Sequence, residues 1–492
     1  MSNKGTKIIV VAVSAVLFIV AIIVINININ RTSTDTGANN RPCTQVNEQR
    51  PDSHTQPGQN QNNQENNDTA PLPNVTSPYV IQDQFPSLHI LSNYNPFDVE
   101  RDFWHNGKLF LTNHADAFEN VDIRIRGRGN STWHFGEDKR PLRLRFEEPQ
   151  SLLDAGHIAR DWVLIANHFD LTLIRTHLAF YLASLLDGMD WTPFSQLVHL
   201  YINGEYVGLY QVADERDIGP GRMQLIFDEN PAISEYLFEL DNNSLNTGVE
   251  GVTFFIADGA PYDIRFPRGN SLSPGHLEYI QKFVLNVNEV VRTRDFVAIS
   301  QIMDIPSMVD FYLVQELFKN IDVGFNSVFM QVRGQGENRR MFWGPVWDFD
   351  RSAGNMYYWH DYQHLHAAVR NYHFRHLLSV PEIFELAAAR WIEISENQVL
   401  QMLAYISYLV ENYESEFNRN FERHPVQELD RLPFWMTSMV PPHLHEIDNW
   451  GGQVEFLQEW FEGRIWWLNQ FFVEDEYLQE WWRNYLVHGY GG

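Results

Sequence analysis

Residues 316–350 decide the fold of this chain and read ELFKNIDVGFNSVFMQVRGQGENRRMFWGPVWDFD. Two apolar runs, 327–332 and 341–347, flank a turn rich in glycine. Their length and composition predict that each run is a β-strand and that the pair forms a hairpin. A hairpin returns the end of its second strand to the end of the sheet where its first strand begins. The residues that flank the two strands on the outside should therefore meet.

Acidic and amide side chains occupy both flanks of this predicted hairpin. Asp322 and Asn326 precede the first strand. Asp348 and Asp350 end the second, where strand alternation would place both carboxylates on one face. Each residue alone would be read as a turn cap or a surface residue, but together they supply the carboxylates that Mg²⁺ prefers beside phosphate oxygens. The cluster therefore predicts metal-dependent phosphoryl transfer, with a separate Asp orienting the acceptor hydroxyl.

A glycine-rich segment lies between two further predicted strands, 121–125 and 142–146, in which apolar and charged residues alternate. It reads Gly127-Arg128-Gly129-Asn130-Ser131-Thr132-Trp133. Glycine lets a backbone approach phosphates closely, and Arg128 adds positive charge. The loop, with Arg128, Asn130 and Ser131, is therefore a candidate nucleotide-binding segment, although a hairpin turn without a ligand is equally natural for it.

Lys139 and Glu215 are further candidates for binding ATP. Lys139 stands at the entry to the strand at 142–146 and would suit the α- and β-phosphates. Glu215 ends a predicted strand, and it either lines a nucleotide pocket or faces solvent. A group of histidines has a spacing compatible with a metal site, but the absence of a carboxylate frame favours a surface loop for its members, which are His360, His364 and His366.

The remaining pattern predicts one α+β domain over residues 79–492. Helices are expected at about 172–187 and 304–320, and Asn203-Gly204 between two apolar runs predicts a second β-hairpin. From about residue 376 the chain reads as helical and rich in aromatic residues. A helical core pattern, rather than a strip for stacking carbohydrate, best fits Trp466, Trp467, Trp481 and Trp482.

The N-terminal part predicts a membrane anchor. Residues 1–7 carry two lysines, and residues 8–29 form an uncharged apolar run long enough to cross a bilayer as a helix. The run lacks the small-residue exit of a cleaved signal peptide. The positive-inside bias predicts a single-pass protein with a cytoplasmic N-terminus and an extracytoplasmic body. Residues 30–78, rich in Asn, Gln, Thr, Asp and Pro, are expected to be a disordered linker.

Composition limits the partners that the chain would bind. The formal net charge is −27, which disfavours nucleic acid, because its binding needs a basic surface, and favours basic partners. The single cysteine, Cys43, permits no intrachain disulfide. Hydrophobic residues make up 44% of the 492 residues, which is enough for a large buried core.

The motifs together resemble the spore coat protein CotH family in their order. Its opening signature is similar to Arg124-x-Arg126-Gly127-x-Gly129-Asn130-Ser131-Thr132-Trp133 and Lys139-Arg140-Pro141-x-Arg143-Leu144-x-Phe146. The resemblance continues to about residue 470 through Trp162-Val163-Leu164-x-Ala166-Asn167, Arg175, Asn203-Gly204-Glu205-Tyr206-x-Gly208-Leu209-Tyr210, Glu316-Leu317-x-Lys319-Asn320-x-Asp322 and Gly344-Pro345-Val346-Trp347-Asp348-Phe349-Asp350.

The resemblance implies an atypical protein-kinase-like fold that uses ATP and Mg²⁺ or Mn²⁺ to phosphorylate serines of spore coat or surface proteins. By this resemblance Asp322 matches the catalytic Asp, Asp348 or Asp350 the metal-binding Asp, and Lys139 the nucleotide Lys. Asn326 departs from the pattern of ordinary kinases, since it lies four residues after Asp322 rather than five.

Two other functions stay open. Some relatives in fungi act as surface invasins, so the fold is also compatible with a non-catalytic adhesin or a coat-assembly protein. A glycoside hydrolase with a carboxylate pair is the third possibility, which is disfavoured because neither Asp348 nor Asp350 sits in an obviously apolar sequence setting. For a kinase, the acidic composition predicts basic, Ser-rich substrates.

Overall fold

The computed structural model describes residues 85–248, 250–356, 360–426 and 440–488. The chain divides into two units, Met1–Gln64 and Glu65–Gly492, and all of the described residues belong to the second. The predicted anchor at 8–29, Cys43 and the predicted linker at 30–78 lie outside the described residues. Among the helices that are described, none is long and apolar enough to cross a membrane. The anchor and the linker stay predictions.

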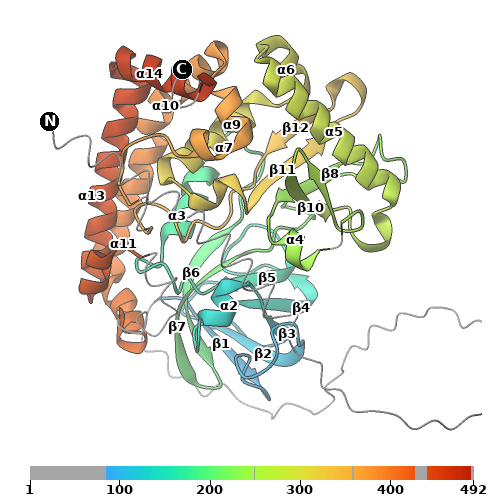
Figure 1. Cartoon of the computed structure of the whole chain (residues 1–492). Helices are drawn as coiled ribbons and strands as arrows, with labels where there is room; N and C mark the ends of the chain where they lie inside the picture. The colour runs from blue at the N-terminus through green and yellow to red at the C-terminus, as the bar shows by residue number, and fades with distance from the viewer. Residues whose placement is uncertain (1–84, 249, 357–359, 427–439, 489–492) are drawn as a thin grey trace, which may run out of the picture. The chain divides into compact units, whose positions relative to one another are not determined.

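The N-terminal half of the described chain is a closed barrel (Figure 1). The strands follow the order β1-β2-β3-β4-β5-β7-β6, and β1 pairs in parallel with β6 to close the ring. The strand predicted at 121–125 shows the expected alternation, since Ile123 and Ile125 point into the core of the barrel while Arg124 and Arg126 are half-buried on its outer face. The strands are β1 (Ser87–Ser92), β2 (His105–Thr112), β3 (Phe118–Gly127), β4 (Leu142–Gln150), β5 (Ala159–Ile165), β6 (Ser195–Ile202) and β7 (Glu205–Asp214).

The hairpin of β6 and β7 agrees with its sequence prediction. Asn203 and Gly204 at its tip have φ of 52° and 88°. Two consecutive left-handed residues match the right-handed twist of the flanking strands, and Asn-Gly tolerates them at low cost. The pair therefore fixes the register in which Ser195 lies opposite Ala213, at the far end of the hairpin.

A second, five-stranded sheet has the order β12-β11-β8-β10-β9 (Figure 1). Its last strand ends at Trp343, earlier than the predicted Trp347, because Pro345 has no N–H to continue the ladder. Neither Asp348 nor Asp350 is in a strand, so the prediction that strand alternation sets their common face is wrong. The strands are β8 (Tyr236–Leu240), β9 (Phe254–Ala257), β10 (Ala260–Phe266), β11 (Val328–Arg333) and β12 (Arg340–Trp343).

Helices cover this sheet and one side of the barrel (Figure 1). The helices are α2 (Ser131–Phe135), α3 (Arg175–Ser184), α4 (Ser244–Thr247), α5 (Pro274–Thr293), α6 (Phe296–Ile302), α7 (Ile305–Phe318), α8 (Ala367–Arg370), α9 (Tyr372–Leu377), α10 (Pro381–Ser395), α11 (Gln398–Arg423), α13 (Trp450–Asn469) and α14 (Glu476–His488). Shorter helical turns are η1 (Gly269–Ser271), η2 (Ile321–Gly324), η3 (Gly336–Asn338), η6 (Pro442–Glu446) and η7 (Gln470–Glu474).

Helix α7 is the central element of the C-terminal half. The Asp304 carboxylate caps its first turn by accepting a hydrogen bond from the Ser307 backbone N–H at 2.9 Å. Every residue from Ser307 to Phe318 is buried, as expected for a helix that is apolar all round. It packs against α3, α10 and β12. This packing holds the C-terminal end of α7, from which the candidate site begins.

A buried ion pair joins α7 to α13. The side chains of Glu316 and Arg464 are both 0% exposed and lie 2.7 Å apart. Glu316 also accepts hydrogen bonds from the backbone N–H groups of His366 and Ala368. His366 is therefore 3% exposed and its ring contacts the Asn320 carbonyl, so the prediction that it lies in a surface loop is wrong. The backbone N–H of His366 supplies one of the hydrogen bonds that the buried Glu316 carboxylate needs.

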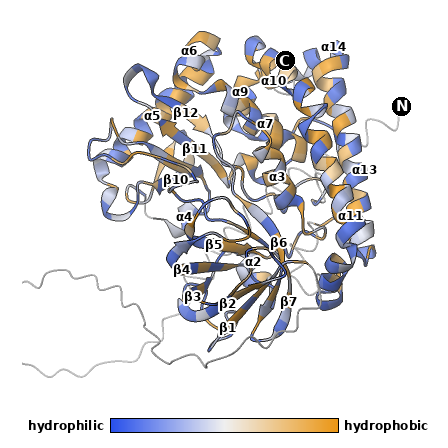
Figure 2. Ribbon diagram, turned by 180° about the vertical axis from the view of Figure 1, so that it is seen from behind, coloured by the Kyte–Doolittle hydropathy of each residue, from blue (hydrophilic) through white to orange (hydrophobic). Residues whose placement is uncertain are grey.

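The aromatic C-terminal helices divide the predicted tryptophans between core and surface. Trp467 and Trp482 are buried, whereas Trp466 and Trp481 are 55% and 43% exposed. Figure 2 shows both hydrophobic and hydrophilic residues on α11 and α13, and α11 is amphipathic. The helical core pattern thus holds for one residue of each Trp-Trp pair, because neighbouring helix positions face different sides.

Candidate functional site: an acidic cleft

The segment after α7 positions Asp322. Lys319 ends the helix with φ 47°, and the chain then forms η2. The Asn320 side-chain oxygen accepts a hydrogen bond from the Asp322 N–H at 3.1 Å, and its amide donates to the Asp348 carbonyl at 3.2 Å. One asparagine thus ties the start of the predicted hairpin to the segment that follows it.

The Asp348–Asp350 segment is fixed by the residue between the two carboxylates. Phe349 is fully buried against Phe318, with ring centroids 5.4 Å apart. Its backbone N–H donates to the Thr176 hydroxyl on α3 at 3.2 Å. With Phe349 turned inward, Asp348 and Asp350 both remain partly exposed and line one cleft. The two carboxylates do share a site, although an irregular turn and not a strand brings them there.

The three carboxylates lie close enough to affect one another. Burial, then the charges of Asp348 and Asp350, raises the pKa of Asp322 well above its usual value. Burial, then the charge of Asp348, raises the pKa of Asp350 to about 7. Like charges in a poorly solvated site disfavour ionisation in this way. A divalent cation would relieve this repulsion, so the carboxylates fit a metal site.

The cleft lies between the barrel and the C-terminal half and encloses about 40 Å³. Arg128 and Asn167 line it from the barrel side, opposite Trp347, Asp348 and Asp350. The Asn167 amide donates to the Leu173 carbonyl and to the Gln211 side chain, both at 3.0 Å. Its oxygen is buried and has no hydrogen-bond partner among the described residues. The Asn167 oxygen is therefore a further candidate metal ligand. Asn167 belongs to a family motif, but the sequence alone did not indicate that it lies in the site.

Asn326 does not join the carboxylates. Its side-chain oxygen accepts a hydrogen bond from the Asn242 N–H at 3.0 Å. The next residue, Ser327, has φ 56°, and its hydroxyl donates to the Asp348 carboxylate at 3.3 Å. The hydrogen bond to the Asp348 carboxylate thus comes from Ser327, and the role of Asn326 as a metal ligand stays a prediction. The five-residue spacing from Asp322 was the signal that pointed to Ser327.

The glycine-rich loop reaches the cleft through Arg128 and Thr132. Gly127 is required there, because a Cβ atom would lie 2.3 Å from the Trp133 ring. Arg128 lines the cleft, whereas Asn130 and Ser131 are exposed. The Asn130 side chain accepts a hydrogen bond from Arg101 at 3.3 Å, and Ser131 begins the short helix α2. Of the three predicted loop residues, only Arg128 faces the carboxylates.

Glu215 lies in a cluster of arginines beside the cleft. Its carboxylate is 3.6 Å from the guanidinium groups of both Arg143 and Arg216. Burial would raise the pKa of Glu215, but Arg216, Arg143 and Arg128 outweigh it and lower the pKa to about 2. The Arg216 and Arg128 guanidiniums lie 4.3 and 5.6 Å from the centre of the Trp347 ring. Glu215 therefore organises the positive wall of the cleft and is not a solvent-edge residue.

Lys139 occupies a different cavity of about 20 Å³, next to His168 and His424. It is 1% exposed, and its amine has no hydrogen-bond partner among the described residues. Burial lowers the pKa of Lys139 to about 7, and the charge of Asp170 only partly opposes this effect. Asp170 forms an ion pair with Arg175, and its charge also contributes to the raised pKa of Asp350. Lys139 therefore lines a cavity separate from the acidic cleft and is not among the residues that line the cleft.

Another acidic group lies on the barrel loops. His114, Asp116 and Asp154 have candidate ligand atoms within 4.8 Å of one another, a spacing that the cleft carboxylates do not meet. Asp116 and Asp154 are exposed, and the His114 ring accepts a hydrogen bond from the Asp116 N–H. His114 and Asp116 belong to the loop between β2 and β3 and Asp154 to the loop between β4 and β5, so the group is separate from the cleft and offers a control for it.

The comparisons with known proteins agree with the order of these motifs. Residues 123–468 match the family model described as CotH kinase protein. The match begins within β3, ends within α13 and covers most of the chain, including the acidic cleft. A search of the curated proteins finds no match. The chain belongs to the CotH kinase protein family.

Proposed function

We propose that this chain is a protein serine kinase that uses ATP and Mg²⁺ or Mn²⁺ to phosphorylate coat or surface proteins. The observation that carries the proposal is the group of three carboxylates, in which burial and then the neighbouring negative charges raise the pKa of both Asp322 and Asp350. Such a group is unfavourable without a cation and becomes favourable once a metal and phosphates are bound. Membership of the CotH kinase protein family supports the same chemistry.

The residues of the cleft divide the work as follows. Asp348 and Asp350, with the oxygens of Asn167 and Ser327, would hold the divalent ion, which neutralises phosphate charge when it is bound. Arg128 would contact the phosphates from the barrel side. Asp322 would orient the serine hydroxyl and accept its proton as the serine oxygen bonds to the γ-phosphorus and the bond to ADP breaks.

The full chain should bind ATP tightly only with Mg²⁺ or Mn²⁺ present. Calorimetry with and without EDTA measures this dependence. Asp348→Asn should weaken binding in the presence of metal, because it removes one carboxylate from the cleft. The control is Asp116→Asn in the exposed group on the barrel loops, which should bind as the unaltered chain does. Equal ATP affinity in EDTA would remove the metal from the proposal.

The substrates proposed are basic, Ser-rich proteins, on the strength of the net charge of −27. Arg128, Arg143 and Arg216 adjoin the cleft and would repel a basic residue next to the acceptor serine. The acidic surface should attract basic peptides, while the arginines should disfavour a basic residue directly beside the serine. We therefore expect kcat/KM to be higher for peptides with Lys or Arg several positions from the serine than for acidic peptides. The difference should shrink with salt, since the Debye length is about 8 Å at physiological ionic strength. Equal values at low salt would exclude charge selection.

The proposed localisation is a single-pass membrane protein with an extracytoplasmic body. Cys43 reports it, because it is the only cysteine and follows the predicted anchor at 8–29. A membrane-impermeant maleimide should label Cys43 in intact cells and should not label a Cys43→Ser variant. Labelling that appears only after lysis would reverse the orientation and expose the body to cytosolic ATP.

A further inference from the structure

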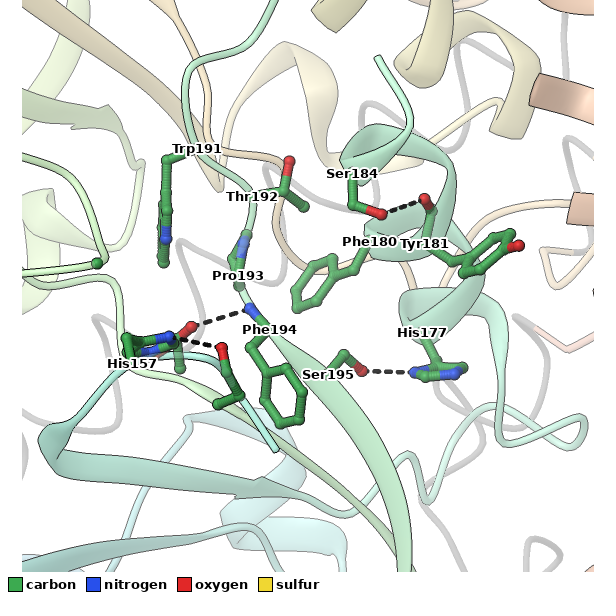
Figure 3. Close-up of a pocket in the computed structure, with 13 residues that line it drawn as sticks. His157, His177, Phe180, Tyr181, Ser184, Trp191, Thr192, Pro193, Phe194 and Ser195 are labelled. Carbon is green, nitrogen blue, oxygen red and sulfur yellow. Dashed lines mark hydrogen bonds and ion pairs between the residues drawn. The ribbon is translucent and has the colours of Figure 1, made fainter. Parts of the chain in front are cut away.

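A cavity of about 310 Å³ lies behind α3, between that helix and the barrel. Its volume is at the lower end of the range of small-molecule sites. Figure 3 shows Trp191 and Phe180 on opposite sides of Pro193, with Phe194 below Phe180. Trp191 is half-buried and Ser184 at the rim is exposed, so the cavity reaches the surface. Three aromatic rings thus surround a space that solvent can enter.

The polar groups of the cavity are paired and carry no net charge. The His157 ring lies 2.7 Å from one Asp214 oxygen, and the Phe194 N–H donates to the other at 2.9 Å. The second His157 nitrogen lies 2.9 Å from the Ala155 carbonyl and so carries a proton. The proton between His157 and Asp214 leaves the pair neutral as a whole, whichever residue holds it.

The second histidine of the cavity is also neutral. His177 contacts the Ser195 hydroxyl at 2.5 Å and the Tyr405 hydroxyl at 2.9 Å. Burial lowers the pKa of His177 to about 4, so it is uncharged at neutral pH. The described residues that line the cavity include no lysine and no arginine. Aromatic walls without net charge suit a flat, uncharged ring and give no site for a phosphate.

Helix α3 separates this cavity from the acidic cleft and touches both. His177 lines the cavity, and its neighbour Thr176 lines the cleft and accepts the Phe349 N–H. Phe180 lines the cavity and packs on Trp347, which lines the cleft, with ring centroids 5.4 Å apart. A ligand against Phe180 would therefore press on the wall that carries Asp348.

We propose that this cavity binds an uncharged, flat aromatic molecule of about the size of a fused double ring, and that its occupancy tightens metal binding in the acidic cleft through Phe180 and Trp347. The ligand stacks on the half-buried Trp191 ring, and Phe180, which is 1% exposed, forms the inner wall of the cavity. It is separate from the nucleotide, because Phe180 and Trp347 stand between it and Asp348. The second half of this inference rests on the proposed metal site.

Indole is the probe, and calorimetry on the full chain is the measurement. We expect a Kd of roughly 1 mM or tighter, which a ligand of this size can reach in a preformed cavity. Trp191→Ala should weaken binding by roughly 3- to 10-fold through loss of one stacked ring. Ser184→Trp should abolish binding by filling the rim. The controls Trp481→Ala, at an exposed tryptophan on α14, and Ser184→Ala should bind indole normally. Benzoate, which is anionic, should not bind.

The proposed site would be overturned if indole did not bind, or if Trp191→Ala and Ser184→Trp bound indole as tightly as the unaltered chain does. The coupling is measured as Mn²⁺ affinity by electron paramagnetic resonance, with and without saturating indole. We expect affinity to rise by about fivefold, the lower end of usual coupling between sites. Bound indole with unchanged or weaker Mn²⁺ affinity would overturn the coupling. Failure of Mn²⁺ to bind at all would instead refute the proposed metal site, while the indole titration would still decide the cavity.

Discussion

Replacing Asp322 with Asn should lower the rate of phosphoryl transfer by roughly 10²- to 10⁴-fold, the usual contribution of a positioned acid or base. The same change should not lower the stability of the fold. Burial and the neighbouring carboxylates raise the pKa of Asp322 in the folded chain. Its ionised form is therefore less stable in the folded than in the unfolded state, and this penalty is present above the usual carboxyl pKa and grows toward neutral pH. The neutral amide removes the penalty.

Two measurements test this pair of expectations. Transfer of labelled phosphate to a Ser peptide gives the rate, and thermal melting at neutral pH gives the stability, which should equal or exceed that of the unaltered chain. Asp304→Asn is the matched control, because asparagine caps α7 as well as aspartate does and the residue lies outside the cleft. Full turnover in Asp322→Asn would refute the catalytic role. A large fall in melting temperature would refute the electrostatic account.

Replacing Arg464 with Met should destabilise the fold by about 3–5 kcal/mol, the cost of leaving one member of a buried ion pair without its partner. Glu316 would be left at 0% exposure without its ion-pair partner. The carbonyls of Tyr362 and His364, which accept hydrogen bonds from Arg464 at 2.9 and 2.8 Å, would also lose their donor. Urea denaturation followed by circular dichroism measures the loss.

Arg483→Met on α14 is the control for this change. Arg483 is half-buried and lies 5.3 Å from the centre of the Phe384 ring, so its removal should cost no more than about 1 kcal/mol. The double variant Glu316→Gln with Arg464→Met should be less destabilised than the sum of the single variants, since no unpaired charge remains. A loss below about 1 kcal/mol for Arg464→Met would show that the pair does not hold α13 to α7.

Elements with strong local signals were predictable from the sequence. The Asn203-Gly204 turn acts over a few residues and appears as expected, and the helix expected from about residue 304 begins at Ile305. The convergence of Asp322 with Asp348 was also predictable in outline, because β11 and β12 do pair as a hairpin. These predictions depend only on the spacing of residues along the chain and on the geometry of hairpins.

The details of the site depended on contacts between distant segments. Ser327 reaches Asp348 because Ser327 itself has a left-handed backbone conformation after η2. A serine in the sequence does not predict that conformation. Asn167 enters the cleft because Gln211, on β7, holds its amide and leaves its oxygen without a hydrogen-bond partner among the described residues. Glu215 could not be placed because the arginines that surround it come from different elements. These are tertiary effects, and local patterns do not encode them.

Closure of the barrel by β1 has a consequence for aggregation. Because β1 pairs with β2 on one side and β6 on the other, no described barrel strand presents an open edge. The remaining edges, β9 and β12, are four residues long each and contact α5 and α7. Short, covered edges discourage strand-to-strand association between chains. A chain shortened past Ser92 would open β2 and β6 together, and two such molecules could complete each other's sheets by exchanging edges.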